Sequence, residues 1–324
     1  MTARLGLIGL GNWGHRLATT LAEIPDADLI SCFARNEDRR RAFAENHACR
    51  AVPSLDAMLA DDIDGVLIAT PHRSHEGLIV AVASAGKHVM AEKPLALDVQ
   101  SAERCVAAAL ENGVILQVAH YRRRLGATRV IRSLIDDGTI GRIHHIDGRF
   151  HRSWGPDLIR PWRDTAEEAP AGAMTALGVH LIDNFLYLGG PIARLSARSE
   201  QLEAVTSIDD VTTVMVEFAS GALGTMATSV RLPFESTTAV YGNGAAAWSE
   251  QDGSQLFVQM ADEEVRTQHP VDTVNGVKAN LEAFVRSLAT GEAPEVDGAA
   301  GLEVVRVFEA IITSSANIGE WIDV

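Results

Sequence analysis

Near its start the chain reads RLGLIGLGNWG (Arg4–Gly14), where an apolar run leads into three spaced glycines and then a helical pattern. Gly9 permits a tight turn from strand to helix, Gly11 lets the backbone approach a pyrophosphate, and Gly14 lets the helix pack close to the sheet. Phosphate groups would bind the unpaired N–H groups at the start of that helix. The segment therefore predicts a dinucleotide site that includes Gly9, Leu10, Gly11, Asn12, Trp13 and Gly14.

Bulk composition narrows the class of protein. The 324 residues suit two domains, and a content of 47% hydrophobic and 22% charged residues is ordinary for a globular chain. The net charge of −15 argues against nucleic acid as a partner, because a phosphate backbone favours clustered lysine and arginine. No apolar run is long enough to cross a membrane. A first strand at Arg4 leaves no room for a signal peptide, and three scattered cysteines suggest reduced thiols, so we expect a cytoplasmic protein.

Strand-like and helical segments alternate over the first 120 residues. The apolar runs predict buried parallel strands, and Asp98 is a suitable N-cap for the helix before the last of them. We expect a doubly wound Rossmann domain over residues 1–121, whose ligand lies at the carboxyl ends of the strands. The expected strands are Leu5–Ile8, Asp28–Ala34, Gly65–Thr70, His88–Ala91 and Val114–Ala119.

After residue 121 the pattern changes to one of long strands separated by turn signals such as Gly242-Asn243-Gly244. This pattern predicts an α+β domain over residues 122–324, with an open, mostly antiparallel sheet that serves substrate binding and oligomerisation. The last two expected helices, near 277–288 and 302–316, are also compatible with packing on the first domain. Weakly polar strand faces favour a homodimer or homotetramer formed through this sheet.

The end of the second expected strand bears on the choice of cofactor. Dinucleotide sites for NAD usually place Asp or Glu here to bind the ribose hydroxyls, whereas this chain has Ala34 followed by Arg35. A carboxylate would repel a 2′-phosphate, and a guanidinium can bind one in bidentate fashion. We therefore predict a preference for NADP over NAD, with Arg39 assisting. The alternative is that Arg35 is only an exposed loop residue.

Two further segments follow strands whose carboxyl ends face the predicted ligand. Pro94 disfavours helical backbone angles at Lys93, so this lysine can project from the strand end into the cleft. There it can hydrogen-bond a substrate oxygen and stabilise charge as hydride moves, unless it is a surface loop lysine. The residues that these two segments add to the predicted cofactor site are Thr70, Pro71, His72, His75, Glu92 and Lys93.

Taken together, these motifs resemble the glucose–fructose oxidoreductase/inositol dehydrogenase family (Gfo/Idh/MocA), over essentially the whole chain. The resemblance implies a Rossmann domain and an open antiparallel sheet with nicotinamide held between them. It also implies oxidation or reduction of a sugar, polyol or related carbonyl compound, and an Ala-Arg end to the second strand is similar to the NADP-using members. It rests on Gly9–Gly14, Ala69-Thr70-Pro71 with His75, Glu92-Lys93-Pro94, Trp162-Arg163, Gly178–Asp183 and Val296–Leu302.

The resemblance further implies roles for single residues. Lys93 contacts the reacting oxygen, His180 transfers the proton, and Trp162 with Arg163 helps to enclose the cofactor. Without that resemblance, His180 alone would be interpreted as a core histidine. Its ordinary pKa near 6.5 suits proton transfer.

One position departs from the family pattern. Many members carry an aspartate four residues before the histidine, where this chain has Ala176. Residues four apart share a helix face, so the chain lacks one group that would orient the substrate and tune Lys93 and His180. Asp183, three residues after the histidine, could steady the imidazole or be a structural carboxylate.

The remaining predictions concern the edges of the site. His120 could line the nicotinamide pocket, and Trp154 could shape the substrate pocket. Strand alternation would put His145 and His151 on one face and His144 on the other, and a metal site would need a third ligand. We therefore interpret them as structural or substrate-lining and expect no metal. The predicted substrate-binding residues are Lys93, Trp154, Arg163, Ala176, His180 and Asp183.

The sequence thus favours an NADP(H)-dependent oxidoreductase for a sugar-like or polyol-like small molecule, with Lys93 and His180 as its catalytic residues. Two other functions stay open. Ala176 is compatible with a non-catalytic protein that senses the cofactor. Similarity to the family also allows a glycoside-cleaving enzyme with a tightly bound cofactor.

Overall fold

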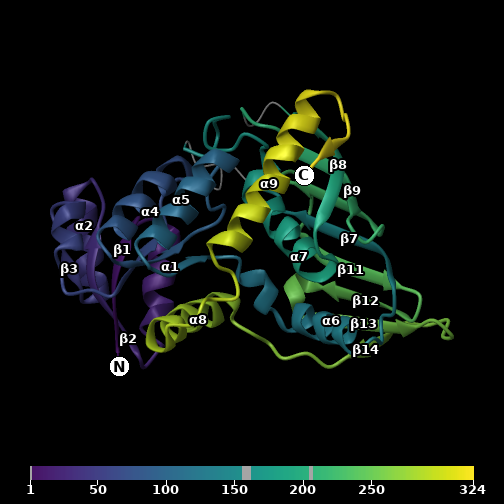
Figure 1. Ribbon diagram of the computed structural model, residues 1–324, viewed down its shortest axis with the longest axis horizontal. Coiled ribbons are helices and arrows are strands. Elements are labelled where there is room, and N and C mark those ends of the chain that lie inside the picture. Colours follow the sequence, from purple (N-terminus) through teal and green to yellow (C-terminus); the bar gives the residue numbers. More distant parts are fainter. Residues whose placement is uncertain (1, 155–161, 204–206) are drawn as a thin grey trace. The chain divides into compact units, whose positions relative to one another are not determined.

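The computed structural model describes residues 2–154, 162–203 and 207–324, which form two compact units (Figure 1). The first unit contains residues 1–120 and 277–305, and the second contains residues 121–276 and 306–324. Helix α8 (Gly276–Thr290), after its first residue, and the first part of α9 (Gly298–Ala316) therefore count with the first unit. The sequence analysis assigned residues 122–324 to the second domain and allowed its last helices to pack on the first.

The first unit is built on a six-stranded parallel sheet in the order β3-β2-β1-β4-β5-β6, which confirms the predicted Rossmann fold. The order reverses between β1 and β4, the place where such sheets bind ligands. Its elements are β1 (Ala3–Ile8), α1 (Asn12–Leu21), β2 (Ala27–Phe33), α2 (Glu37–His47), β3 (Arg50–Ala51), α3 (Leu55–Leu59), β4 (Gly65–Ile68), the 3₁₀ turn η1 (His72–Ser74), α4 (His75–Ser84), β5 (His88–Ala91), α5 (Val99–Glu111) and β6 (Leu116–Val118).

Local chemistry explains where these elements begin. All four residues of β4 are buried, as a strand covered by helices on both faces requires. Asp98 caps α5 as predicted, because its side chain accepts the Ser101 N–H at 2.7 Å. Asn36 caps α2 in the same way, through the Arg39 N–H at 2.8 Å. The short elements β3 and α3 were not predicted, since so few residues show no periodic pattern.

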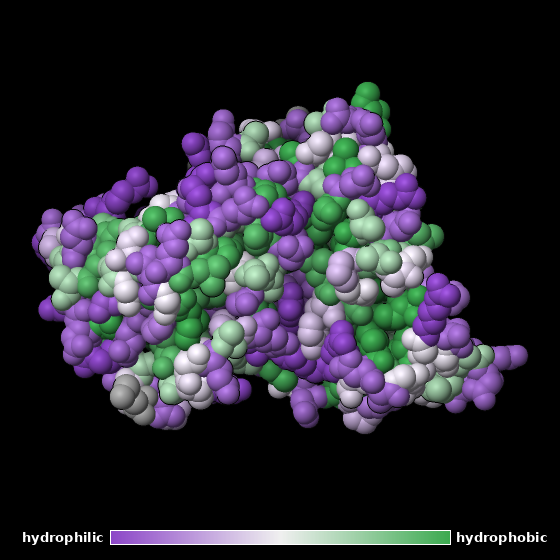
Figure 2. Space-filling view, in the orientation of Figure 1, coloured by the Kyte–Doolittle hydropathy of each residue, from purple (hydrophilic) through white to green (hydrophobic). Residues whose placement is uncertain are grey.

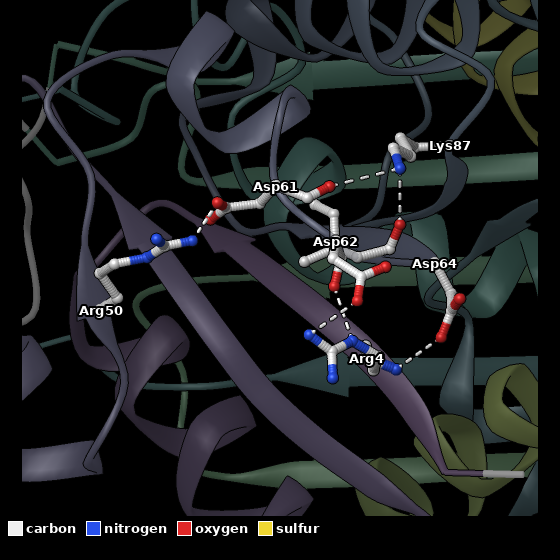
Figure 3. Close-up of polar contacts among 7 residues, drawn as sticks. Arg4, Arg50, Asp61, Asp62, Asp64 and Lys87 are labelled. Atoms are coloured by element: carbon white, nitrogen blue, oxygen red, sulfur yellow. Dashed lines mark hydrogen bonds and ion pairs between the residues drawn. The ribbon is translucent and has the colours of Figure 1, made fainter.

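Polar side chains tie the amino ends of the strands together, at the edge opposite the predicted ligand (Figure 3). The Arg4 main-chain N–H donates to Asp64 Oδ2 at 2.7 Å, and the Arg4 side chain binds Asp62. Lys87, just before β5, donates to the Ile63 carbonyl at 2.8 Å, and Arg50 pairs with Asp61. These contacts connect β1, β4 and β5 and leave the carboxyl edge of the sheet to other residues.

The second unit contains a nine-stranded sheet in the order β14-β13-β12-β11-β7-β10-β9-β8-β15. Only β7 and β10 are parallel among the described pairs, so the sheet is mostly antiparallel, as predicted. Its elements are η2 (Tyr121–Arg124), α6 (Gly126–Asp136), β7 (Ile143–His151), the π-helical turn η4 (Met174–Gly178), α7 (Val179–Gly189), β8 (Ile192–Glu200), β9 (Val211–Phe218), β10 (Leu223–Ser229), β11 (Glu235–Gly242), β12 (Ala245–Glu250), η5 (Gln251–Gly253), β13 (Gln255–Met260), β14 (Thr267–His269) and β15 (Ile322–Asp323).

Helix α7 packs closely on this sheet. A Cβ at Gly148 of β7 would lie 2.8 Å from the Phe185 ring, and one at Gly224 of β10 would lie 2.9 Å from it. The two glycines on neighbouring strands therefore make room for Phe185, which is fully buried. This packing fixes the helix whose first turn contains His180.

The surface in Figure 2 mixes hydrophobic and hydrophilic side chains over both units. Met215 on β9 and Leu223 on β10 are 51% and 53% exposed, on strands that pair with each other. Within the described ranges, the structure contains no helix with the length and apolar character that a membrane span needs.

Candidate active site

The glycine-rich turn has the geometry that the sequence predicts for a phosphate-binding turn. Gly9 has φ +97°, and a Cβ there would lie 2.3 Å from the Ala69 carbonyl oxygen. A Cβ at Gly14 would lie 2.1 Å from the Gly9 carbonyl oxygen, so the helix could not approach the strand as it does. Beside Gly11, by contrast, nothing lies within 4 Å of a Cβ position. The start of α1 is thus open to a pyrophosphate, and these residues fit a dinucleotide.

The turn after β2 holds the residues that bear on cofactor choice. Arg40 shapes this turn, because its Nη1 donates to the carbonyl oxygens of Ala34 at 2.7 Å and Arg35 at 3.2 Å. The side chains of Arg35 and Arg39 are exposed beside it. The turn therefore presents two guanidinium groups and no carboxylate at the position where an NAD site usually has one.

His75 joins the two strand-end segments of the predicted cofactor site. Its ring nitrogens lie 2.9 Å from the Pro94 carbonyl oxygen and 3.1 Å from that of Thr70. The residue is fully buried, and this burial lowers the pKa of His75 below its ordinary value. A neutral imidazole has one N–H and can donate to only one of these two carbonyl oxygens at a time. The ring nevertheless lies between the turn after β4 and the turn after β5. His72 is also buried, with its ring centroid 5.9 Å from that of His75.

Lys93 lies in the turn after β5, between Glu92 and a cis peptide bond to Pro94. The Glu92 main-chain N–H donates to the Ile68 carbonyl at 2.9 Å, which continues the sheet ladder to the residue before Lys93. The Glu92 carboxylate accepts a hydrogen bond from the indole N–H of Trp13. Lys93 is half-buried at the carboxyl edge of the sheet, as the sequence predicted for the end of this strand.

In the second unit, His180 lies in the first turn of α7. Its ring centroid is 5.4 Å from the Tyr121 ring and 6.1 Å from the Phe150 ring, and the residue is 5% exposed. Ala176 lies one turn earlier, in the π-helical turn η4, and is partly exposed while the other residues from 171 to 183 are buried. Such π-helical turns are frequent at functional sites.

Asp183 has a partner that the sequence did not indicate. Its Oδ1 lies 2.8 Å from Arg123 Nε and 2.7 Å from Arg123 Nη2, and Asp183 is completely buried. The neighbouring Arg122 lies with Cζ 4.3 Å from the Phe150 ring and pairs with Asp252. The run Tyr121-Arg122-Arg123-Arg124 was the only sequence signal for these contacts, and the partners lie too far along the chain to be inferred from it.

The other predicted residues lie in the same unit or at its border. Trp154 is 8% exposed, and its main-chain N–H and carbonyl oxygen bond Val230 and Arg231, both at 2.8 Å. The Arg163 guanidinium lies 4.6 Å from the Trp162 ring centroid. His120 is fully buried, at the point where the chain first passes from the first unit to the second. Across the described ranges, no three His, Cys, Asp or Glu side chains form a metal-binding group.

Comparison with known protein families identifies the class. Residues 3–120 match the model of an oxidoreductase family with an NAD-binding Rossmann fold (GFO_IDH_MocA), and residues 128–247 match the model of the GFO/IDH/MocA C-terminal domain. Since the two matches cover most of the chain, it belongs to the Gfo/Idh/MocA family and is an oxidoreductase of the dehydrogenase/reductase type.

Individual relatives agree with this assignment. The chain is 28% identical over 319 residues to 1,5-anhydro-D-fructose reductase of Ensifer adhaerens, covering 94% of this chain and 95% of the relative. A solved structure from Desulfitobacterium hafniense, for which an NADPH-dependent oxidoreductase activity has been suggested, has a TM-score of 0.94 at 26% identity and covers 100% of this chain and 98% of its own. Levoglucosan dehydrogenase in complex with NADH and levoglucosan shares the fold, with a TM-score of 0.91 at 23% identity and 100% of both chains covered.

Proposed function

We propose that this protein is an NADP(H)-dependent oxidoreductase that transfers hydride to or from a sugar, polyol or related carbonyl or hydroxyl compound. The placement of Lys93 carries this proposal: it stands at the carboxyl edge of the Rossmann sheet, in the same unit as an open glycine-rich turn. The names of relatives such as 1,5-anhydro-D-fructose reductase support a substrate of this class.

The Lys93 ammonium is assigned to the substrate oxygen. An ammonium can donate a hydrogen bond to a carbonyl and stabilise the negative charge that develops there, or lower the barrier to deprotonation of an alcohol. The bound cofactor supplies hydride exchange at its nicotinamide C4. Thr70, Pro71, His72, His75 and Glu92 belong to the turns on either side of that lysine, while His120, Trp162 and Arg163 are assigned to cofactor binding.

His180 is assigned to the proton. Its ring is packed against Tyr121 and Phe150, which limits its motion and excludes water. An imidazole in such a place can accept the proton of a substrate hydroxyl and return it in the reverse direction. Trp154, Arg163 and Ala176 are assigned to the substrate. Asp183 contributes through Arg123, because that ion pair holds the segment that contains Tyr121.

The preference for NADP rests on Arg35 and Arg39, which are exposed beside the turn after β2. We assign the 2′-phosphate to these guanidinium groups.

We further propose that Met215 and Leu223 are covered by a second copy of the chain, in a homodimer or homotetramer formed through the nine-stranded sheet. Replacing Leu223 with Lys should then lower the molar mass measured by light scattering, and an unchanged monomer in both proteins would refute this assembly.

A screen of sugars, polyols and their keto forms with both reduced and oxidised cofactors, read at 340 nm, tests the function. Turnover with NADP(H) supports the proposal. Binding without any turnover would instead identify a cofactor-sensing protein, and sugar release without net change of cofactor would identify a glycoside-cleaving enzyme. Ala176→Asp adds a second readout. Higher turnover in this variant would show that the site has lost a useful carboxylate at this position. Lower turnover would show that the site is adapted to a different substrate.

A further inference from the structure

Two of the three cysteines lie together beside the turn after β2. Cys32 belongs to β2 and is fully buried, whereas Cys49 comes just before β3 and is partly exposed. We propose that a hydroperoxide oxidises Cys49, that Cys32 then closes a disulfide with it, and that this disulfide weakens binding of the cofactor. The last part rests on the assignment of the turn after β2 to the 2′-phosphate.

The backbone brings these two cysteines together. In the parallel pair of β2 and β3, Cys32 lies opposite Ala51, and the Val52 N–H donates to the Cys32 carbonyl oxygen at 3.1 Å. Helix α2 is followed by Ala48, whose φ of +50° is in the left-handed region and turns the chain toward β3. Cys49 therefore enters the edge of the sheet beside β2, where its thiol is in hydrogen-bond contact with that of Cys32.

The two thiols differ as an attacking and a resolving cysteine do. A thiol has one proton, which Cys32 can give either to the Arg40 carbonyl oxygen, 3.8 Å from its Sγ, or to the sulfur of Cys49. Once Cys49 is a thiolate, its bond from Cys32 is charge-assisted and is the stronger of the two. This bond lowers the pKa of Cys49 and raises the pKa of Cys32. Cys49 therefore holds more of the nucleophilic thiolate than an ordinary cysteine does.

Oxidation proceeds in two balanced steps. The Cys49 thiolate attacks one oxygen of the hydroperoxide, the O–O bond breaks, and the products are a sulfenic acid at Cys49 and a hydroxide or alkoxide ion. The Cys32 sulfur then displaces the hydroxyl group of the sulfenic acid, so an S–S bond forms and the S–O bond breaks. The Cys32 proton leaves with that hydroxyl group as water. Overall, the two sulfurs lose two electrons and the peroxide gains them.

The disulfide acts on the cofactor turn through Arg40. The Arg40 side chain donates to the carbonyl oxygens of Ala34 and Arg35, and its own main-chain carbonyl oxygen lies near the Cys32 thiol. Once Cys32 is bonded to Cys49, its sulfur carries no proton and cannot donate to that carbonyl oxygen. We expect the start of α2 to shift and NADPH to bind about fivefold more weakly, the size of one neutral hydrogen bond.

A count of thiols after peroxide treatment tests the pair without any cofactor. The protein is treated with hydrogen peroxide and unfolded, and its remaining thiols are alkylated and located by peptide mass spectrometry. Of the three thiols, only that of Cys105 should remain, because burial raises the pKa of Cys105 to about 12. The other two should appear in one linked peptide that dithiothreitol releases. Three free thiols, a bond to Cys105, a link between two chains, or Cys49 oxidised beyond the sulfenic acid with Cys32 still free would each overturn the proposal.

Two variants test the order of the steps. In Cys49→Ser both remaining thiols should survive the same treatment, because Cys32 is buried and retains its proton. Cys105→Ser is the matched control and should form the disulfide as the wild type does. Loss of the Cys32 thiol in Cys49→Ser at the wild-type rate would show that Cys32 reacts first, which also contradicts the proposal.

Fluorescence titration with NADPH tests the effect on the cofactor. The oxidised wild type should bind NADPH more weakly than the reduced protein by the factor given above, and dithiothreitol should restore the affinity. Peroxide-treated Cys49→Ser should keep its affinity, which separates the disulfide from other oxidative damage. Equal affinities of the oxidised and reduced wild type would overturn the regulation. A reduced protein that binds neither NADPH nor NADH would contradict the proposed function and the regulation with it, while the thiol count would still decide whether the disulfide forms.

Discussion

Arg123 and Asp183 form an ion pair inside the second unit, with Arg123 Nη2 2.7 Å from Asp183 Oδ1 and the carboxylate fully buried. Removing one partner leaves the other charge buried without compensation. Asp183→Ala should therefore lower the free energy of unfolding by about 3–5 kcal/mol, measured by urea denaturation. The exposed pair Arg194–Glu217 is the control, and Glu217→Ala should cost less than about 1 kcal/mol. Equal effects of the two variants would show that Asp183 does not hold Arg123 as described.

The roles of Lys93 and His180 predict a loss of turnover without a loss of cofactor. Lys93→Ala and His180→Ala should each lower kcat by about 10²–10⁴-fold, because each would remove a group that we assign to the reacting oxygen or its proton. Cofactor affinity, measured by fluorescence titration, should stay near that of the wild type. His144→Ala, an exposed position on β7, is the control. Normal rates in both variants would refute the assigned roles.

Cofactor choice is predicted to depend on Arg35. The wild type should bind NADPH more tightly than NADH, and Arg35→Ala should weaken NADPH binding by about 10- to 100-fold, the range for lost charge-assisted hydrogen bonds. NADH binding should hardly change. Arg41→Ala, which removes an exposed guanidinium paired with Glu37 on the same helix, should leave both affinities unchanged. Tighter binding of NADH by the wild type would end the prediction.

Burial of His75 predicts a loss of stability in mild acid. The pKa of His75 is lowered from 6.5 in the folded protein, mainly by burial, so below that pH the unfolded chain binds a proton that the folded imidazole does not. The free energy of unfolding should therefore decrease as the pH drops through 6.5. His75 alone contributes a decrease of up to about 1.4 kcal/mol per pH unit. His47, His88 and His151 have lowered pKa values for the same main reason and act in the same direction.

The variant His75→Gln isolates that contribution. Its unfolding free energy should decrease less between pH 7.5 and pH 5 than that of the wild type, in urea titrations at the two pH values. His269→Gln, at an exposed position, should decrease as the wild type does. An identical pH dependence in all three proteins would contradict the role given to burial.

The sequence predicted those features that depend on neighbours along the chain. The turn at Gly9 and the cap at Asp98 follow from a few adjacent residues, and the parallel and antiparallel sheets follow from the spacing of apolar runs. The roles assigned to the site residues are still predictions.

Features that depend on distant partners were missed. Asp183 and Arg123 are 60 positions apart, and Trp13 and Glu92 are 79 positions apart. Which donor meets which carboxylate depends on the packing of whole elements, so no local pattern contains it. The π-helical turn at Met174–Gly178 was predicted as ordinary helix, because the apolar pattern of a π turn differs from it by a single residue.

The most direct test of the account is a crystal structure of the protein with NADP⁺ and a polyol substrate identified by the screen. The account predicts that Lys93 Nζ and a ring nitrogen of His180 both lie within hydrogen-bond distance, about 3 Å, of the same substrate oxygen next to the nicotinamide C4. A structure in which the two groups bind different parts of the ligand, or in which either points into solvent, would contradict it.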